Sequence, residues 1–148
     1  LARKILGSKG AILQPFMADV TQFCQANANN AAMTEQIQTL GAYFQQWQDI
    51  TADVGKKAMG NADEIGGASV DYLMFAGYVT LAYFWAQMAS VAHEKLKTGA
   101  EDAAFYQAKL QTCEFYFKRI LPRAQGHAAC IAGGSDSMMS LASEDFSF

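Results

Sequence analysis

The chain has 148 residues, a formal net charge of −3 and a pI of about 5.2, and 51% of its residues are hydrophobic. A single domain of this size can bury a core without support from disulfides or metal ions. Basic residues adjoin only in short pairs, so the sequence does not predict the continuous positive surface that nucleic-acid binding requires.

Three cysteines, Cys24, Cys113 and Cys130, lie far apart in the chain, and the sequence contains no Cys-x-x-Cys pair. An odd number of cysteines at wide spacings, each in an apolar helix-like context, argues against a disulfide framework. We therefore expect three reduced thiols in the core of an intracellular, cytoplasmic protein.

Residues 1–10 are basic and contain two glycines, so we interpret them as a connector. The chain begins on leucine, within what resembles the end of another element, and a fragment boundary is the simplest explanation. A first helix is predicted over residues 11–26, where Ile12, Phe16, Val20 and Phe23 form one apolar stripe. Pro15 lies in its first turn, where a missing N–H is harmless.

A second helix is predicted over residues 31–59, because its apolar positions alternate steps of three and four. These positions form a heptad seam of Ile37, Leu40, Phe44, Trp47, Thr51, Val54 and Ala58. Asn61 and Glu64 then form an N-x-x-E pair, a variant of the capping box, which predicts a third helix over residues 62–98. Gly66 and Gly67 near its start would let the chain bend or let a neighbour approach closely.

The third helix contains a stretch without formal charge, residues 72–92, that is long enough to cross a bilayer. Polar Thr80 and Gln87 interrupt it, its flanks show no strong positive-inside bias, and the other predicted helices each present an apolar seam that needs a partner. We therefore interpret the stretch as the buried spine of a helical bundle, with no membrane span. On this interpretation Gly77→Leu or Trp85→Asp would unfold the domain.

A fourth helix is predicted from about residue 101 to the glycine pair at 133–134. Its apolar steps again alternate between four and three, through Tyr106, Leu110, Cys113, Phe117, Ile120, Ala124, His127 and Ile131. Pro122 falls inside this run and is expected to kink the helix without ending it.

The expected fold class is all-α, with an up-and-down four-helix bundle over residues 11–134. Short loops make consecutive helices antiparallel neighbours, which favours this topology. Residues 135–148 are expected to form a short tail with an apolar patch of Met138, Met139, Leu141 and Phe146.

The sequence offers little catalytic chemistry. Neither histidine belongs to the Glu-x-x-His pair of a di-iron bundle, and the chain has no Walker A, G-x-S-x-G or H-E-x-x-H motif. We expect no catalytic residue and no metal site. His127 could act as an acid, a base or a ligand-gripping group, but a core-edge histidine with a local hydrogen-bond partner is the favoured interpretation. His93 is interpreted as a solvated surface residue, and Glu114 as a carboxylate on the flank of the seam rather than a buried general base.

Many aromatic side chains could line a flat hydrophobic ligand pocket, although ordinary bundle core is the favoured interpretation. They are Trp47, Tyr72, Phe75, Tyr78, Tyr83, Phe84 and Trp85. By the same logic, Met88, Met138 and Met139 are interpreted as gap fillers.

Several segments together resemble one known family. The run ASVDYLMFAGYVTLAYFWAQMA resembles the signature of the C-terminal helical domain of bacterial acyl-CoA dehydrogenases (the acetyl-CoA dehydrogenase-like C-terminal domain), with Val70 in place of an aromatic residue. The matching positions are Asp71, Tyr72, Leu73, Gly77, Val79, Trp85 and Met88. AFYQAKLQTCEFYFKRILPRA resembles the fourth helix of that domain, GSDSMMSL resembles its closing tail, and LARKIL resembles the end of the dehydrogenase core.

The resemblance implies an accessory domain of an FAD-dependent acyl-CoA dehydrogenase, whose parent chain would oxidise acyl-CoA to 2,3-enoyl-CoA with a glutamate base. The catalytic and flavin-binding segments would lie upstream, so this chain alone is expected to be inactive and to bind no FAD. The implied partners are the upstream core, a second copy in a homo-oligomer and the acyl-CoA substrate of the parent. A free-standing helical bundle for protein interaction or ligand binding, without catalysis, is the alternative.

Overall fold

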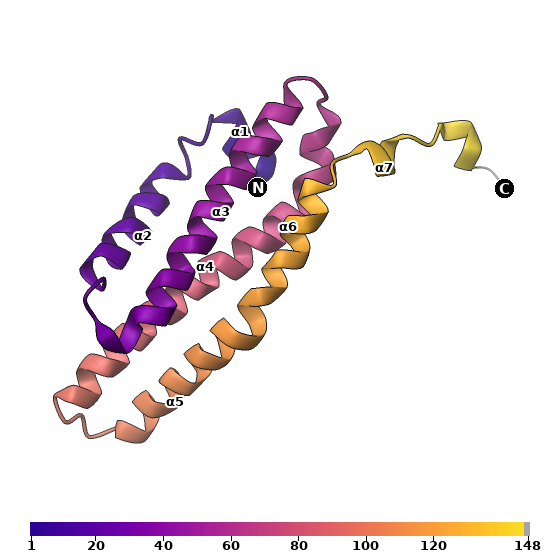
Figure 1. Cartoon of the computed structure of the whole chain (residues 1–148). Helices are drawn as coiled ribbons and strands as arrows, with labels where there is room; N and C mark the ends of the chain where they lie inside the picture. The colour runs from indigo at the N-terminus through magenta and orange to yellow at the C-terminus, as the bar shows by residue number, and fades with distance from the viewer. Residues whose placement is uncertain (147–148) are drawn as a thin grey trace.

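The computed structural model describes residues 1–146, and its regular elements are all helical (Figure 1). The predicted all-α class is therefore confirmed. The longer helices are α2 (Gln14–Ala26), α3 (Thr34–Ala58), α4 (Asp63–Lys97), α5 (Ala103–Phe115) and α6 (Ala124–Ala132). Two short helices, α1 (Ala2–Gly7) and α7 (Asp136–Met139), lie near the ends of the chain.

Helix α4 is the centre of the fold. It contacts α3, α5 and α6 most extensively, and α1 packs against it as well. Helix α2 packs on α3 and reaches α4 through the rings of Phe16 and Phe23, both of which meet Tyr83 edge to face. In Figure 1, α2, α3, α4 and the α5–α6 segment run in alternating directions along the chain.

Within the segment interpreted as a connector, residues 2–7 form helix α1. Ala2 and Ile5 lie on one side of this helix and are buried in the core. The turn that follows uses a left-handed backbone at Lys9 and Gly10, with φ of 52° and 81°. Glycine adopts this conformation without strain, so Gly10 turns the chain toward α2.

The chain continues through Pro122 as a helix, as predicted, but its geometry changes one turn earlier. Helix α5 passes into a π-helical turn at Tyr116–Ile120 and a 3-10 turn at Leu121–Arg123 before α6 begins. A π turn inserts one residue and rotates the helix face. The rotation explains why Tyr116 and Leu121, outside the predicted seam, are buried while Phe117 is only half-buried.

A closed set of hydrogen bonds joins α3 to α4 inside the core. The indole Nε1–H of Trp47 donates to the Tyr72 hydroxyl at 2.9 Å, and that hydroxyl lies 2.6 Å from Thr51 Oγ1. The Thr51 hydroxyl in turn donates to the Trp47 carbonyl at 2.7 Å, so Tyr72 is the donor to Thr51. Burial raises the pKa of Tyr72, because a phenolate would lose its hydration there.

The start of α4 is capped partly as predicted. Asn61 Oδ1 accepts the backbone N–H of Asp63 at 3.0 Å. Glu64 does not complete a capping box; its carboxylate accepts both the backbone N–H and the hydroxyl of fully buried Ser135, at 3.2 and 2.9 Å. This clamp fixes the end of α6 against the start of α4.

In the glycine pair of α4, Gly67 lets the start of the tail approach the helix closely, and the pair does not serve to bend the helix. A Cβ on Gly67 would stand 2.9 Å from Met138 Cε and 3.2 Å from Ser135 Cβ, whereas one on Gly66 would meet open space. The tail therefore begins with a tight contact to α4.

Only one side of α4 is buried, so the predicted spine is half correct. Its inward face includes Tyr72, Phe75 and Val79, whereas its outward face carries exposed apolar side chains, namely Val70, Leu73, Met74, Leu81, Phe84, Met88 and Val91. No atom lies within 4 Å of a Cβ placed on Gly77, so the expectation that Gly77→Leu would overpack the core is wrong. Trp85 is half-buried and stacks on Tyr116.

By length and apolar composition, α4 is the one helix within residues 1–146 that could cross a membrane. The central helix of a soluble domain meets the same description, and one third (33%) of the most apolar window of α4 is buried inside the domain.

The three cysteines lie in different environments. Cys113 is buried, and burial together with the nearby Glu114 carboxylate raises its pKa to about 11. Cys24 is half-buried, and burial raises its pKa as well. Cys130 is exposed on α6, so the expectation of three core thiols is wrong for this residue. The buried residues of α6 are Ala124, Ala128 and Ile131, and Cys130 lies on the opposite, exposed face.

Replacement of Tyr72 by phenylalanine tests the buried hydrogen bonds. The variant leaves the Trp47 N–H without its acceptor, so we expect a loss of about 1–3 kcal/mol in the free energy of unfolding. Urea denaturation followed by circular dichroism measures this loss. Tyr43→Phe, on a half-buried ring of α3, is the control and should change stability by less than about 0.5 kcal/mol. Equal effects of the two variants would contradict a special role for Tyr72.

Thiol reactivity tests the environments of the cysteines. At about pH 8, DTNB should modify Cys130 rapidly, whereas Cys113 should react only on unfolding, because a thiol with a pKa of about 11 carries about one thiolate in a thousand there. Raising the pH should increase the thiolate fraction of Cys113. Cys130→Ser should abolish the fast phase, and a fast phase that survives this substitution would contradict the assignment.

Candidate functional site

A carboxylate–imidazole pair joins α4 to α6. Asp71 Oδ1 lies 2.7 Å from His127 Nδ1, and the two side chains are 29% and 26% exposed. The Tyr78 ring stacks on the imidazole with centroids 5.7 Å apart and planes 26° from parallel. His127 thus has the local hydrogen-bond partner that the core-edge interpretation requires. The sequence did not indicate Asp71 as this partner, because 56 positions separate the two residues.

The pair has the donor and acceptor types needed to move a proton, but not the arrangement of a nucleophilic site. Within residues 1–146, no hydroxyl or thiol is hydrogen-bonded to the other imidazole nitrogen of His127. The Tyr116 hydroxyl donates instead to the Tyr78 carbonyl, at 2.9 Å, and burial raises the pKa of Tyr116 to about 12. These contacts fix α4 against the α5–α6 segment.

The other titratable candidates lie away from this pair. Glu114 is exposed and pairs with Lys118 at 2.7 Å; this hydrogen bond lowers the pKa of the Glu114 carboxyl. Its flank position is therefore as predicted, and a buried general base would show the opposite shift. His93 is half-buried rather than fully solvated, and lines a shallow polar depression with Asn29, Asn30 and Glu94.

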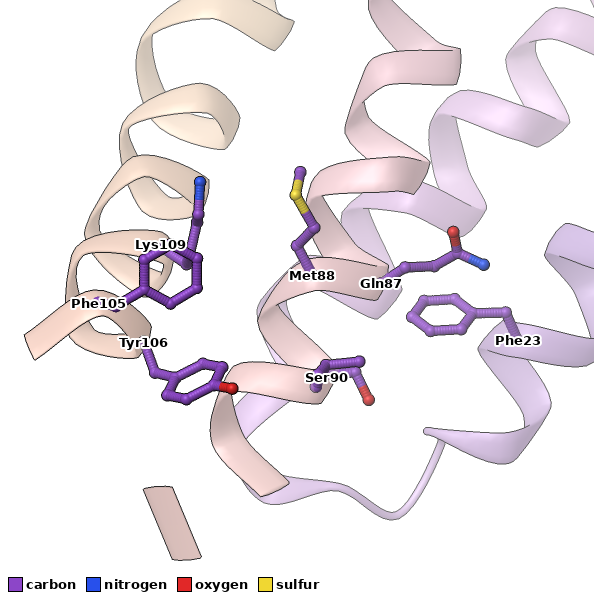
Figure 2. Close-up of a pocket in the computed structure, with 8 residues that line it drawn as sticks. Phe23, Gln87, Met88, Ser90, Phe105, Tyr106 and Lys109 are labelled. Carbon is purple, nitrogen blue, oxygen red and sulfur yellow. The ribbon is translucent and has the colours of Figure 1, made fainter. Parts of the chain in front are cut away.

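An apolar groove lies between α2, α4 and α5 (Figure 2). It has a volume of about 540 Å³ and is lined by Phe23, Gln87, Met88, Ser90, Val91, Phe105, Tyr106 and Lys109. Figure 2 shows Phe105 and Lys109 on the α5 side, across from Met88. The Lys109 ammonium lies 5.1 Å from the Phe105 ring centroid and 5.9 Å from that of Trp85, a cation–π arrangement.

None of the aromatic residues singled out as a possible pocket lines this groove. Phe23, Phe105 and Tyr106 are the aromatic residues that line it instead. Phe105 and Tyr106 are adjacent near the start of the fourth predicted helix, and this adjacency is the sequence feature that could have indicated an aromatic wall. A second apolar groove, of about 480 Å³, runs along the other side of α4 between Phe16, Leu73, Gly77 and Leu81. The outward face of α4 thus separates two grooves.

These grooves do not fit a flavin dinucleotide. A pyrophosphate needs several converging cations or backbone N–H groups, and Lys109 is the one cation of the first groove, where it already lies over two rings. Among residues 1–146, no cluster of three histidine, cysteine or acidic side chains could hold a metal ion. We therefore derive no cofactor chemistry from the side chains of this chain.

A double-mutant cycle tests the Asp71–His127 contact. We expect Asp71→Ala and His127→Ala each to destabilise the fold, with a coupling free energy of about 1 kcal/mol because the hydrogen bond can be lost only once. Urea denaturation at neutral pH measures all four proteins. The same cycle with the more exposed Glu114–Lys118 pair is the matched control and should give a smaller coupling. Strict additivity for Asp71 and His127 would contradict the contact.

Most of this chain is similar to one known protein family. No curated protein matches the chain. A family model described as "Acetyl-CoA dehydrogenase C-terminal like" matches residues 16–142, which include α3, α4, α5 and α6, the Asp71–His127 pair and the first groove. Because the match spans far more than half of the chain, the protein belongs to the acetyl-CoA dehydrogenase C-terminal-like family.

Proposed function

We propose that the chain is the accessory C-terminal domain of an FAD-dependent acyl-CoA dehydrogenase. The family match over residues 16–142 is the observation that carries this proposal. The catalytic core would lie in the same polypeptide.

The parent enzyme would oxidise an acyl-CoA thioester to the 2,3-enoyl-CoA. In this reaction a glutamate of the core removes the α-proton and FAD accepts the β-hydrogen as hydride. Both groups would belong to the core, so this chain contributes no catalytic step. The parent enzyme would be soluble and located in the cytoplasm.

We propose that residues 11–134 form an up-and-down four-helix bundle of α2, α3, α4 and the α5–α6 segment. The alternating helix directions in Figure 1 and the contacts of α4 with its neighbours support this topology. Residues 1–10 would lead from the core into the bundle, and residues 135–148 would form its tail, of which residues 147–148 lie outside the described part.

The role of the domain would be packing, subunit assembly or shaping of the acyl pocket. Its apolar side chains support an interface role, because seven of those exposed on α4 lie together on one face. Exposed apolar surface of this kind marks an interaction site more often than a monomer surface.

Flavin content and turnover test the proposal. The 148-residue protein should be colourless and inactive, whereas its parent polypeptide should carry FAD and reduce an electron acceptor when given acyl-CoA. Absorbance spectroscopy and a dye-reduction assay with acyl-CoA thioesters of several chain lengths measure both. A stoichiometric flavin on the 148-residue protein, or a parent without flavin, would contradict the proposal.

A further inference from the structure

The outward face of α4 carries a regular stripe. Its positions are Val70, Met74, Gly77, Leu81, Phe84, Met88 and Val91, with steps that alternate between four and three. All seven residues are exposed, and none is charged or polar. At 1.5 Å per residue the stripe is about 30 Å long. An alternation of four and three is the pattern by which one helix packs along another.

Gly77 lies near the middle of this stripe, where the domain itself does not require a glycine. Its φ is not positive, and a Cβ at this position would have no neighbour within 4 Å. A glycine inside an exposed helix makes that helix less stable than an alanine would. The absence of a side chain would, however, let the backbone of a second helix approach α4 closely.

The two ends of the stripe carry opposite charges. Asp63 precedes Val70 by seven positions and Lys95 follows Val91 by four, so both continue the same pattern, and both are exposed. The acidic end coincides with the positive end of the helix dipole and the basic end with the negative end. If a second α4 of the same sequence lay antiparallel on this face, its acidic end would therefore face the basic end of the first helix, and its basic end the acidic end.

We propose that a second copy of the chain covers this stripe, with α4 packed antiparallel on α4 around a two-fold axis near Val79. This register places Gly77 opposite Leu81 of the second copy, so that a missing side chain faces a large one. It also places Met74 opposite Phe84 and Val70 opposite Met88.

The charged ends match in the same register. Asp63 of each copy faces Lys95 of the other, once at each end of the interface. A self-complementary patch of this kind is what a two-fold dimer requires. The inference gives the subunit-assembly role of the proposed function a defined interface, and it rests on the α4 surface alone, so the mass of the protein tests it separately from the dehydrogenase assignment.

The mass of the protein in solution tests the dimer. Light scattering coupled to size exclusion, over a wide range of concentration, should give twice 16.1 kDa. Leu81→Asp should raise the dimer dissociation constant by about 100-fold or more, because two carboxylates would be buried at the axis. Phe115→Asp, on an α5 side chain of matched exposure (55% against 51%), should leave it unchanged.

A circular dichroism melt of each variant separates loss of pairing from loss of folding. A monomer at every concentration would overturn the proposal and leave the dehydrogenase core as the occupant of the stripe. A dimer that survives Leu81→Asp in a folded protein would also overturn it.

Charge reversal tests the antiparallel register. Asp63→Lys and Lys95→Asp should each weaken the dimer about 3- to 10-fold at low salt, because like charges then face each other at both ends. The double variant should restore the parental dissociation constant. Sedimentation equilibrium measures all four proteins. Failure of the double variant to restore binding would overturn this register.

Discussion

Small side chains on the inward face of α4 let the rest of the structure assemble. The alanines buried there are Ala68, Ala76, Ala82, Ala86, Ala89 and Ala92. Without large side chains of its own at these positions, α4 can be approached closely on this face by α3, α5 and α6. The neighbouring helices then supply the bulk, with Phe44 and Trp47 from α3 and Ile131 from α6. The hydrogen bonds of Tyr72 fix the register of α3 on this surface.

Much of this fold could be predicted from the sequence, because helices follow from local patterns. The heptad seam of α3 is buried at Leu40, Phe44, Trp47 and Val54, and the Asn61 cap lies where the N-x-x-E pair indicated. Helix α1 was missed because six residues are too few for a periodic pattern to register. The π turn rotates the buried face without leaving a local sequence pattern, so the predicted seam passes through Phe117 and Ile120, whereas the structure buries Tyr116 and Leu121.

The candidate site was less predictable, since its geometry depends on contacts between distant segments. Sequence reasoning selected His127 and expected a partner, but only the packing of α6 on α4 identifies Asp71. The surroundings of the uncharged stretch of α4 also depend on contacts that a local sequence pattern does not specify. The composition of the stretch indicates contact on most sides, and the structure divides it into a face that serves the core of this domain and a face that does not. A single sequence does not distinguish burial inside a domain from burial between chains.

The hydrogen bonds between Glu64 and Ser135 determine which parts of the chain unfold together. They join residues 71 positions apart and so close a loop that contains most of α4, α5 and α6. Closing a long flexible loop has an entropic penalty that grows only slowly with length, so one well-buried contact can hold such a loop. Beyond Met138, which packs at Gly67 of α4, the chain leads away from the helices (Figure 1). Fraying that begins at the tail should therefore stop at Ser135, and the first turn of α4 should exchange its amide hydrogens together with the end of α6 as one cooperative unit.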